Sequence, residues 1–177
     1  LGGDGGDELF AGYDTYRAPR LFGYYDLLPA VLKDAAGALA EKMPVSTRNM
    51  SLDFRVKKFI SGRNYPPEKR NTIWLGSFGD KELDSLLAGG RPPEGRDYIF
   101  EDISECMPAL SEIEDPIERM QYLDMHFYMQ DDILAKVDRS SMMHALEVRV
   151  PLINYELVEY VLGLPSRFKL RGLTTKY

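Results

Sequence analysis

Residues 1–13 read L-G-G-D-G-G-D-E-L-F-A-G-Y, a glycine-rich and acidic stretch that leads into a helical pattern. Glycine reaches backbone angles that side chains forbid, and it leaves backbone N–H groups open to a ligand. The helical pattern begins near Glu8, and the start of a helix carries free N–H groups and a partial positive charge that suit phosphate. Carboxylates there can cap the helix or hold a cation such as Mg²⁺. The stretch alone admits either a tight turn with Asp7 as N-cap or a nucleotide-binding loop.

The rest of the chain predicts a mainly α-helical fold, from its apolar spacing and its helix-capping residues. Only Glu147–Val150 and Phe168–Leu170 could form strands. We therefore expect residues 1–13 to be the remnant of a parallel-sheet domain. Helices are expected at residues 8–22, 27–43, 52–60, 68–75, 81–87, 96–107, 133–146 and 155–162, with a buried central helix that starts at Pro116.

Side-chain patterns predict which helix faces are buried. Asp80 and Asn154 are expected to cap the helices that follow them, and Gly89–Gly95 is expected to be a loop or linker. The lysine and arginine cluster around Lys57 is interpreted as a solvated face rather than an anion site. The face of helix 27–43 predicted to be buried comprises Leu28, Val31, Leu32, Ala35, Ala36 and Leu39. The methionines predicted to fill the core are Met125, Met129, Met142 and Met143.

Composition restricts the function classes. The chain has 177 residues and 28 acidic against 22 basic side chains, a net charge of −6, which argues against a nucleic-acid-binding surface. No apolar run approaches the ~20 residues of a membrane helix. The single cysteine, Cys106, excludes an intrachain disulfide, fits a cytoplasmic location and is predicted to be a buried structural thiol. His126 and His144 lack metal-ligand spacing and are predicted to be hydrogen-bonded helix residues.

Three stretches, in the same order, resemble the synthetase domain of glutamine-hydrolysing asparagine synthetases. They are residues 2–13, Asp131–Leu152 (D-D-I-L-A-K-V-D-R-S-S-M-M-H-A-L-E-V-R-V-P-L) and Phe168–Tyr177 (F-K-L-R-G-L-T-T-K-Y). Residues 44–116 carry no motif of that family. Gly2 stands where the family usually has serine, and Asn154 where it often has aspartate. The family's upstream Ser-Gly-Gly-x-Asp-Ser pyrophosphate loop and its N-terminal glutaminase domain are not in the sequence.

The resemblance implies that residues 1–177 are the C-terminal portion of an α/β synthetase domain of the ATP-pyrophosphatase type. The implied activity is amidation of aspartate to asparagine through a β-aspartyl-adenylate, with ATP and Mg²⁺ as cofactors. The implied partners are aspartate, ATP, ammonia derived from glutamine, and a glutaminase domain in the same longer chain. A homodimer is left open. Neither nucleic acid nor a membrane is an expected partner.

Site residues follow from the resemblance one at a time. Gly2 and Gly3 match positions that line the adenylate, and Asp4 matches the acidic position beside it. Asp7 matches a ligand of Mg²⁺, while Glu8 is expected to cap the helix behind the loop. The C-terminal stretch supplies Lys176, which matches the lysine that meets the transition-state charge, and Lys169 as a weaker candidate for nucleotide binding. Four further positions are expected to be structural: Asp138, Arg139, Glu147 and Arg149.

Two other functions stay open. One is a related enzyme that adenylates another carboxylate, such as a β-lactam synthetase or another amidotransferase, although that β-lactam branch has tyrosine at the position of Asp4. The other is a non-catalytic helical module that retains the loop. The 177 residues alone are expected to be inactive.

Overall fold

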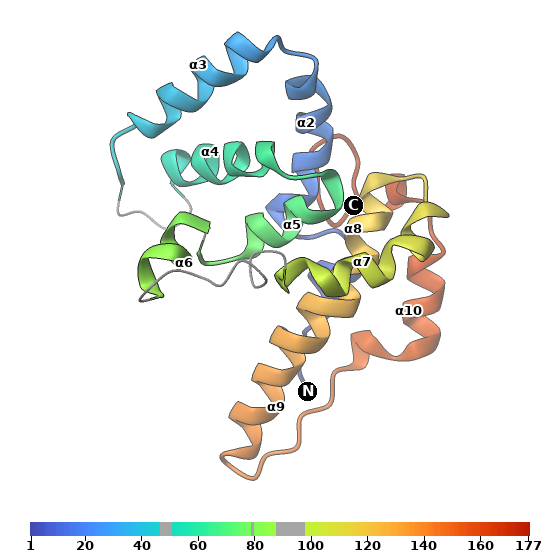
Figure 1. The fold of residues 1–177 in the computed structure, drawn as a ribbon. Helices are drawn as coiled ribbons and strands as arrows, with labels where there is room; N and C mark the ends of the chain where they lie inside the picture. Colours follow the sequence, from blue (N-terminus) through green and yellow to red (C-terminus); the bar gives the residue numbers. More distant parts are fainter. Residues whose placement is uncertain (47–50, 79, 88–97) are drawn as a thin grey trace. The chain divides into compact units, whose positions relative to one another are not determined.

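The computed structural model describes residues 1–46, 51–78, 80–87 and 98–177. These residues are helical apart from loops and one isolated β-bridge between Arg171 and Thr174 (Figure 1). The mainly α prediction is confirmed, and the two expected strands are wrong. Glu147–Val150 runs without a strand partner in the described ranges, and residues 166–168 form a 3₁₀ turn instead. None of the described helices combines the length and apolar character that a membrane crossing requires.

The chain divides into two compact units, and the first is discontinuous in sequence. Unit 1 comprises residues 1–17 and 106–177, and unit 2 comprises residues 18–105. The helices of unit 1 are α1 (Gly6–Leu9), α8 (Pro116–Leu123), a π-helical segment (Asp124–Leu134), α9 (Ala135–Met142) and α10 (Tyr155–Leu162). Those of unit 2 are α2 (Ala18–Asp26), α3 (Ala30–Glu41), α4 (Leu52–Ser61), α5 (Pro67–Leu75) and α6 (Asp80–Leu86), while α7 (Tyr98–Ser111) spans the boundary.

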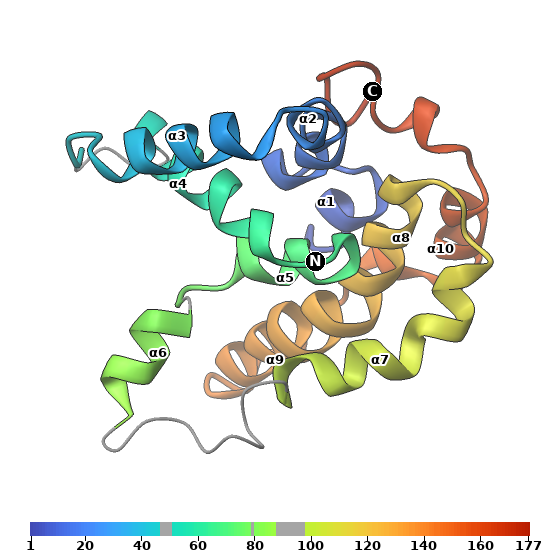
Figure 2. The same ribbon diagram turned by 45° about the horizontal axis from the view of Figure 1, so that its top comes forward.

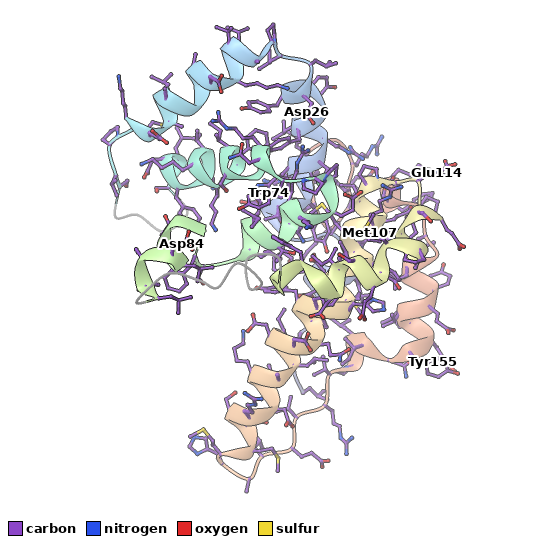
Figure 3. The ribbon with its side chains drawn as sticks, in the orientation of Figure 1. Asp26, Trp74, Asp84, Met107, Glu114 and Tyr155 are labelled. Carbon is purple, nitrogen blue, oxygen red and sulfur yellow. The ribbon has the colours of Figure 1, made fainter. Side chains whose placement is uncertain are left out.

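An aromatic cluster forms the core of unit 2. The rings of Phe22 and Phe59 have centroids 4.5 Å apart, and Trp74 lies 5.5 Å from Phe22. The buried indole of Trp74, labelled in Figure 3, donates to the Phe59 carbonyl at 3.4 Å. Arg70 places its guanidinium carbon 4.2 Å from the Phe22 ring centroid. This cluster ties α2, α4 and α5 together.

The face of α3 predicted to be buried is wrong. Val31 and Leu39 are 77% and 70% exposed, whereas Gly37 and Ala40 are buried. A Cβ on Gly37 would lie 2.6 Å from the Arg63 guanidinium. The face of α3 that packs against a neighbour therefore carries small residues. Helical spacing identifies an apolar stripe, but the stripe is buried only where a neighbour covers it.

The basic cluster of α4 includes a lysine that serves an internal role. The Lys58 ammonium donates to the Ile73 carbonyl at 3.0 Å and to the Gly76 carbonyl, at the end of α5. Burial lowers the pKa of Lys58. A cation at a helix C-terminus satisfies carbonyls that lack an intrahelical partner. The predicted loop Gly89–Gly95 and the side chain of Asp80 lie outside the described residues.

The predicted central helix of unit 1 is confirmed and is longer than expected. Residues 116–142 form one continuous helical rod, α8 followed by the π-helical segment and α9, which Figure 2 shows as yellow passing into orange without a break. The sequence between Tyr128 and Ile133 contains no glycine or proline, so nothing in it separates two helices. Ile117, Met120 and Leu123 are buried as predicted.

The methionine prediction is confirmed in part. Met129 is buried, whereas Met142 and Met143 are 56% and 83% exposed at the end of α9. The sequence-predicted cap at Asn154 is confirmed, because its side chain accepts from the Glu156 backbone N–H at 3.0 Å. Asp115 caps α8 in the same way, accepting from Ile117 N at 2.7 Å.

Candidate functional site

The glycine-rich stretch forms a turn and a helix of one turn, which corrects the predicted helix at residues 8–22. α1 spans Gly6–Leu9, and a 3₁₀ turn (Asp14–Arg17) follows it. Ala11 interrupts the helical path because its φ is 50°, in the left-handed region. At the other end, Gly5 has φ 90° and a Cβ there would lie 2.6 Å from the Ile153 side chain. Glycine is therefore required at position 5 by both conformation and space.

Glu8 does not cap the helix, contrary to the prediction. The cap position is Gly5, without a side-chain cap bond. Glu8 is buried instead, and its carboxylate accepts a hydrogen bond from the Tyr13 hydroxyl. Burial and this contact raise the pKa of Tyr13. The acidic residue of the loop therefore anchors the segment that follows α1.

Gln121 of the central helix binds the C-terminal end of α1. This residue is fully buried, and its amide nitrogen donates to the Glu8 and Leu9 carbonyls at 2.8 and 2.7 Å. Carbonyls at the end of a helix lack intrahelical partners, so the contacts act as a C-terminal cap. The amide oxygen of Gln121 accepts from the Lys169 ammonium at 3.0 Å.

A second buried contact joins the chain after α1 to the central helix. The Tyr16 hydroxyl donates to the Asp124 carboxylate at 2.6 Å. Burial raises the pKa of Tyr16 well above its ordinary value, and the Asp124 charge adds to the shift. Tyr13 stacks on Tyr16, with ring centroids 6.3 Å apart. Buried hydrogen bonds therefore hold the glycine loop and the segment after it against the central helix.

The structure brings together Asp7 and Lys176, two of the predicted site residues, from opposite ends of the chain. The Lys176 ammonium lies 2.8 Å from Asp7 Oδ1, with the two side chains 52% and 39% exposed. Lys176 has φ 51°, and the neighbouring Tyr177 N–H donates to the Lys169 carbonyl at 3.0 Å. An exposed pair of this kind contributes little to stability, but it can exchange partners with a charged ligand.

The other loop residues lie beside this pair in sequence. Asp4 is half-buried in the turn that precedes α1. The Gly2 N–H donates to the Arg149 carbonyl at 2.8 Å, so the predicted extended segment does lie against the loop. A Cβ on Gly2 would lie 3.2 Å from Val148 and 2.9 Å from the Asp4 carboxylate, whereas one on Gly3 would meet nothing within 4 Å.

Lys169 occupies a different environment from Lys176. It is 1% exposed, and burial lowers its pKa, while the charges of Glu118 and Asp115 partly oppose that shift. Its ammonium contacts Gln121 in the interior. The structure gives Lys169 a structural contact behind α1, and its nucleotide-binding role stays a prediction.

The residues present fit one kind of magnesium site, in which the protein supplies only one or two of the ligands. The described residues contain no cluster of three or more side chains that could enclose a metal. Mg²⁺ on phosphates needs only one or two protein carboxylates, with the remaining ligands from phosphate and water. Asp7, half-exposed at the start of α1, can supply one such carboxylate.

The remaining predicted residues differ in their surroundings, and their roles stay predictions. His126 places Nδ1 2.9 Å from the Tyr122 carbonyl and stacks on that ring, as expected of a hydrogen-bonded helix residue. His144 is exposed in the turn that follows α9 and not in a helix, and Cys106 is half-buried rather than buried. Arg149 and Glu147 form an exposed ion pair at 2.7 Å. Asp138 and Arg139 are exposed on α9.

The buried polar residues that hold the loop, Gln121 and Asp124, were not identified from the sequence. Gln121 and Asp124 follow Ile117 at intervals of four and seven residues, which places all three on one face of the helix. Polar residues on a buried face must find hydrogen-bond partners. That spacing was the available signal for an internal contact.

Comparisons with known proteins indicate the family of this chain. The family model described as asparagine synthase matches residues 1–177. The chain is 34% identical over its whole length to a putative glutamine-hydrolysing asparagine synthetase of Mycobacterium tuberculosis (strain H37Rv), and 29% identical to the glutamine-hydrolysing asparagine synthetase 1 of Bacillus subtilis. It is 27% identical, over 96% of its length, to the amidase chry2 of Gibberella zeae.

The chain spans only 26% of the length of each of these relatives. No solved structure matches it. The family match nevertheless extends from the glycine-rich loop to Lys176 and leaves no part of the chain outside it. This chain therefore belongs to the asparagine synthase family.

Proposed function

We propose that this chain is part of a glutamine-hydrolysing asparagine synthetase and contributes to the amidation of aspartate. The β-carboxylate of aspartate attacks the α-phosphorus of ATP, which gives β-aspartyl-adenylate and releases pyrophosphate. Ammonia released from glutamine by a glutaminase domain of the longer chain then attacks the β-carbonyl carbon. AMP leaves, a proton is lost from the amine, and asparagine results.

The observation that carries the proposal is the 2.8 Å contact between Asp7 and Lys176. Two motifs at opposite ends of the sequence supply an acidic and a basic side chain to one place. An ammonium can stabilise negative charge that develops on phosphate and carbonyl oxygens. Bound Mg²⁺, with Asp7 as a ligand, would neutralise part of the phosphate charge. The Gly2 and Gly3 backbone would line the adenylate, and Asp4 would position the acyl group and the incoming amine.

Steady-state kinetics on the full-length synthetase test the role of Lys176. We expect Lys176→Ala and Lys176→Arg both to lower kcat and kcat/KM together, with a much smaller change in KM for ATP, because the charge acts mainly in the transition state. The compact ammonium suits this position better than a planar fork. Circular dichroism checks that both variants fold.

The outcome decides between roles. Near-parental kcat in both variants would contradict the assignment. Loss in the alanine variant alone would show that positive charge matters and that the ammonium shape does not. Arg167→Ala, an exposed cation elsewhere in unit 1, serves as a control that should leave kcat unchanged.

A second candidate is the amidation of another carboxylate. The amidases chry2 of Gibberella zeae and chyE of Penicillium rubens align with 96% and 97% of the chain at 27% and 28% identity. Pyrophosphate release measured with a panel of carboxylic acids distinguishes the candidates. Release that depends on aspartate supports an asparagine synthetase, and release with another acid supports the second candidate.

A further inference from the structure

Gly12 lies against both members of the Asp7–Lys176 pair. A Cβ built on Gly12 would lie 2.0 Å from Asp7 Oδ1 and 2.3 Å from Lys176 Cε. Real Cβ atoms essentially never come within 3.0 Å of another heavy atom in this way. The absence of a side chain at position 12 therefore leaves the space in which the carboxylate and the ammonium meet.

The backbones around this space are held in place. The Gly12 N–H donates to the Asp7 carbonyl at 2.7 Å, so Gly12 is tied to the residue it would strike. The backbone beside Lys176 is fixed by the bond from the Tyr177 N–H to the Lys169 carbonyl, at 3.0 Å. Lys169 is itself buried and bonded to Gln121. A collision at Gly12 must therefore be relieved by the Asp7 and Lys176 side chains.

Other glycines of the loop differ from Gly12 in this respect. A Cβ on Gly5 would collide with the Ile153 side chain, and its φ of 90° strains any substitution. A Cβ on Gly3 would meet nothing within 4 Å. At Gly12 the colliding atoms are the ends of two flexible side chains, which can swing away at small cost to the fold. Substitution there should disturb the ion pair rather than the fold.

We propose that Gly12 is a positioning residue that sets the meeting of Asp7 and Lys176. Its structural part stands on geometry alone, and its kinetic part rests on the proposed function. Gly12→Ala separates the ammonium from the carboxylate and leaves both side chains intact. The variant thus retains every charge of the site and loses only their relative placement.

The structural test uses the side-chain nitrogen resonance of Lys176 in the 177-residue chain. In a chain that keeps Gly12, Asp7→Asn should shift this resonance, because Asp7 and Lys176 are in direct contact. In the Gly12→Ala background the same substitution should leave it unmoved. Gly23→Ala is the matched control, since a Cβ on Gly23 meets nothing within 4 Å. A shift of equal size in the Gly12→Ala background would overturn the proposal.

The kinetic test uses the full-length synthetase. Gly12→Ala should lower kcat by about 100-fold, the scale expected when catalytic groups are displaced by about 1 Å. Combined with Lys176→Ala, it should cost less than the product of the two separate losses, because both changes displace the Lys176 ammonium. Two losses that multiply would overturn the proposal. A full-length protein without synthetase activity would refute the proposed function, while the resonance test would still decide the placement.

A folding failure also gives a decision. If Gly12→Ala unfolds, a triple variant that also shortens Asp7 and Lys176 to alanine removes the colliding atoms. Recovery of the helical circular dichroism signal would assign the collision to these two side chains and support the proposal. A triple variant that stays unfolded would overturn it, because the collision would then lie on the backbone.

Discussion

Three tyrosine hydroxyls near the glycine loop share an electrostatic property. Burial raises the pKa of Tyr13, Tyr16 and Tyr128. The folded chain therefore keeps phenol protons that the unfolded chain releases above about pH 10. The unfolded state then binds fewer protons, so stability falls as pH rises. This contribution is fully present below about pH 10 and is lost above it.

Tyr16→Phe tests this at one residue. Removing the hydroxyl takes a donor from the buried Asp124 carboxylate, and we expect a loss of about 1–3 kcal/mol near neutral pH. The variant should then lose less stability than the parent above about pH 10, since it has one fewer phenol to ionise. Urea unfolding of both chains across that pH range measures the difference.

Comparing Tyr16→Phe with the parent chain cancels an opposing pH dependence of stability, which comes from Lys169. Burial lowers the pKa of Lys169, so that lysine favours the folded state increasingly as pH rises toward about 10.5. Both chains carry Lys169, and its contribution cancels in the difference. Tyr24→Phe is the control because Tyr24 is 75% exposed. A Tyr16→Phe curve that parallels the parent at every pH would contradict the role of Tyr16.

Asp7 and Lys176 were both predicted from motif positions, but their contact was not. Residue identity indicates which groups are available, whereas the contact depends on how the intervening chain folds. Glu8 shows the opposite error. Its place near a helix start is typical of a capping residue, but the neighbouring Tyr13 offered a donor in the interior and Glu8 is bonded there.

At the scale of elements, α1 depends on the central helix. A single helical turn is not stable alone, because nucleation costs more than one turn returns. We expect Gln121→Leu to destabilise unit 1 by about 1–3 kcal/mol, since it leaves buried carbonyls without donors. Gln121→Glu should also destabilise it, because a carboxylate accepts from Lys169 but cannot donate to those carbonyls.

Hydrogen exchange at the amides of α1 and chemical denaturation check this prediction. Exchange in α1 should quicken in both Gln121 variants. Gln130→Leu, an exposed position on the same rod, is the matched control and should leave exchange unchanged. Protection of α1 equal to the parent's would show that Gln121 is not its anchor.

Helix ends were more predictable than helix faces. Asn154 caps its helix as expected, since a cap depends on a few adjacent residues. The α3 stripe failed because burial depends on a partner distant in sequence. The break expected before Ile133 failed because the π-helical segment carries the rod through it. Features that depend on adjacent residues could be predicted from the sequence, whereas burial by a segment distant in sequence could not.

At the scale of the whole molecule, the 177 residues are a small part of the machinery used by their relatives, 26% of the length. We predict that they make no asparagine from ATP, aspartate and ammonia on their own. Loss of a single oxyanion donor can cost about 100- to 1,000-fold in rate, and the family's pyrophosphate loop would supply several. Aspartate-dependent pyrophosphate release from the purified chain would contradict this, with the full-length protein as positive control.

The discontinuity of unit 1 has a consequence for biosynthesis. Within this segment, the glycine loop is synthesised before Gln121, Lys169 and Lys176, which hold it. At about 5–20 residues per second, the ribosome needs on the order of ten seconds or more to reach them. During that interval the Leu9 carbonyl lacks the Gln121 amide that binds it in the finished protein. These contacts of the loop therefore form only as translation of this segment ends.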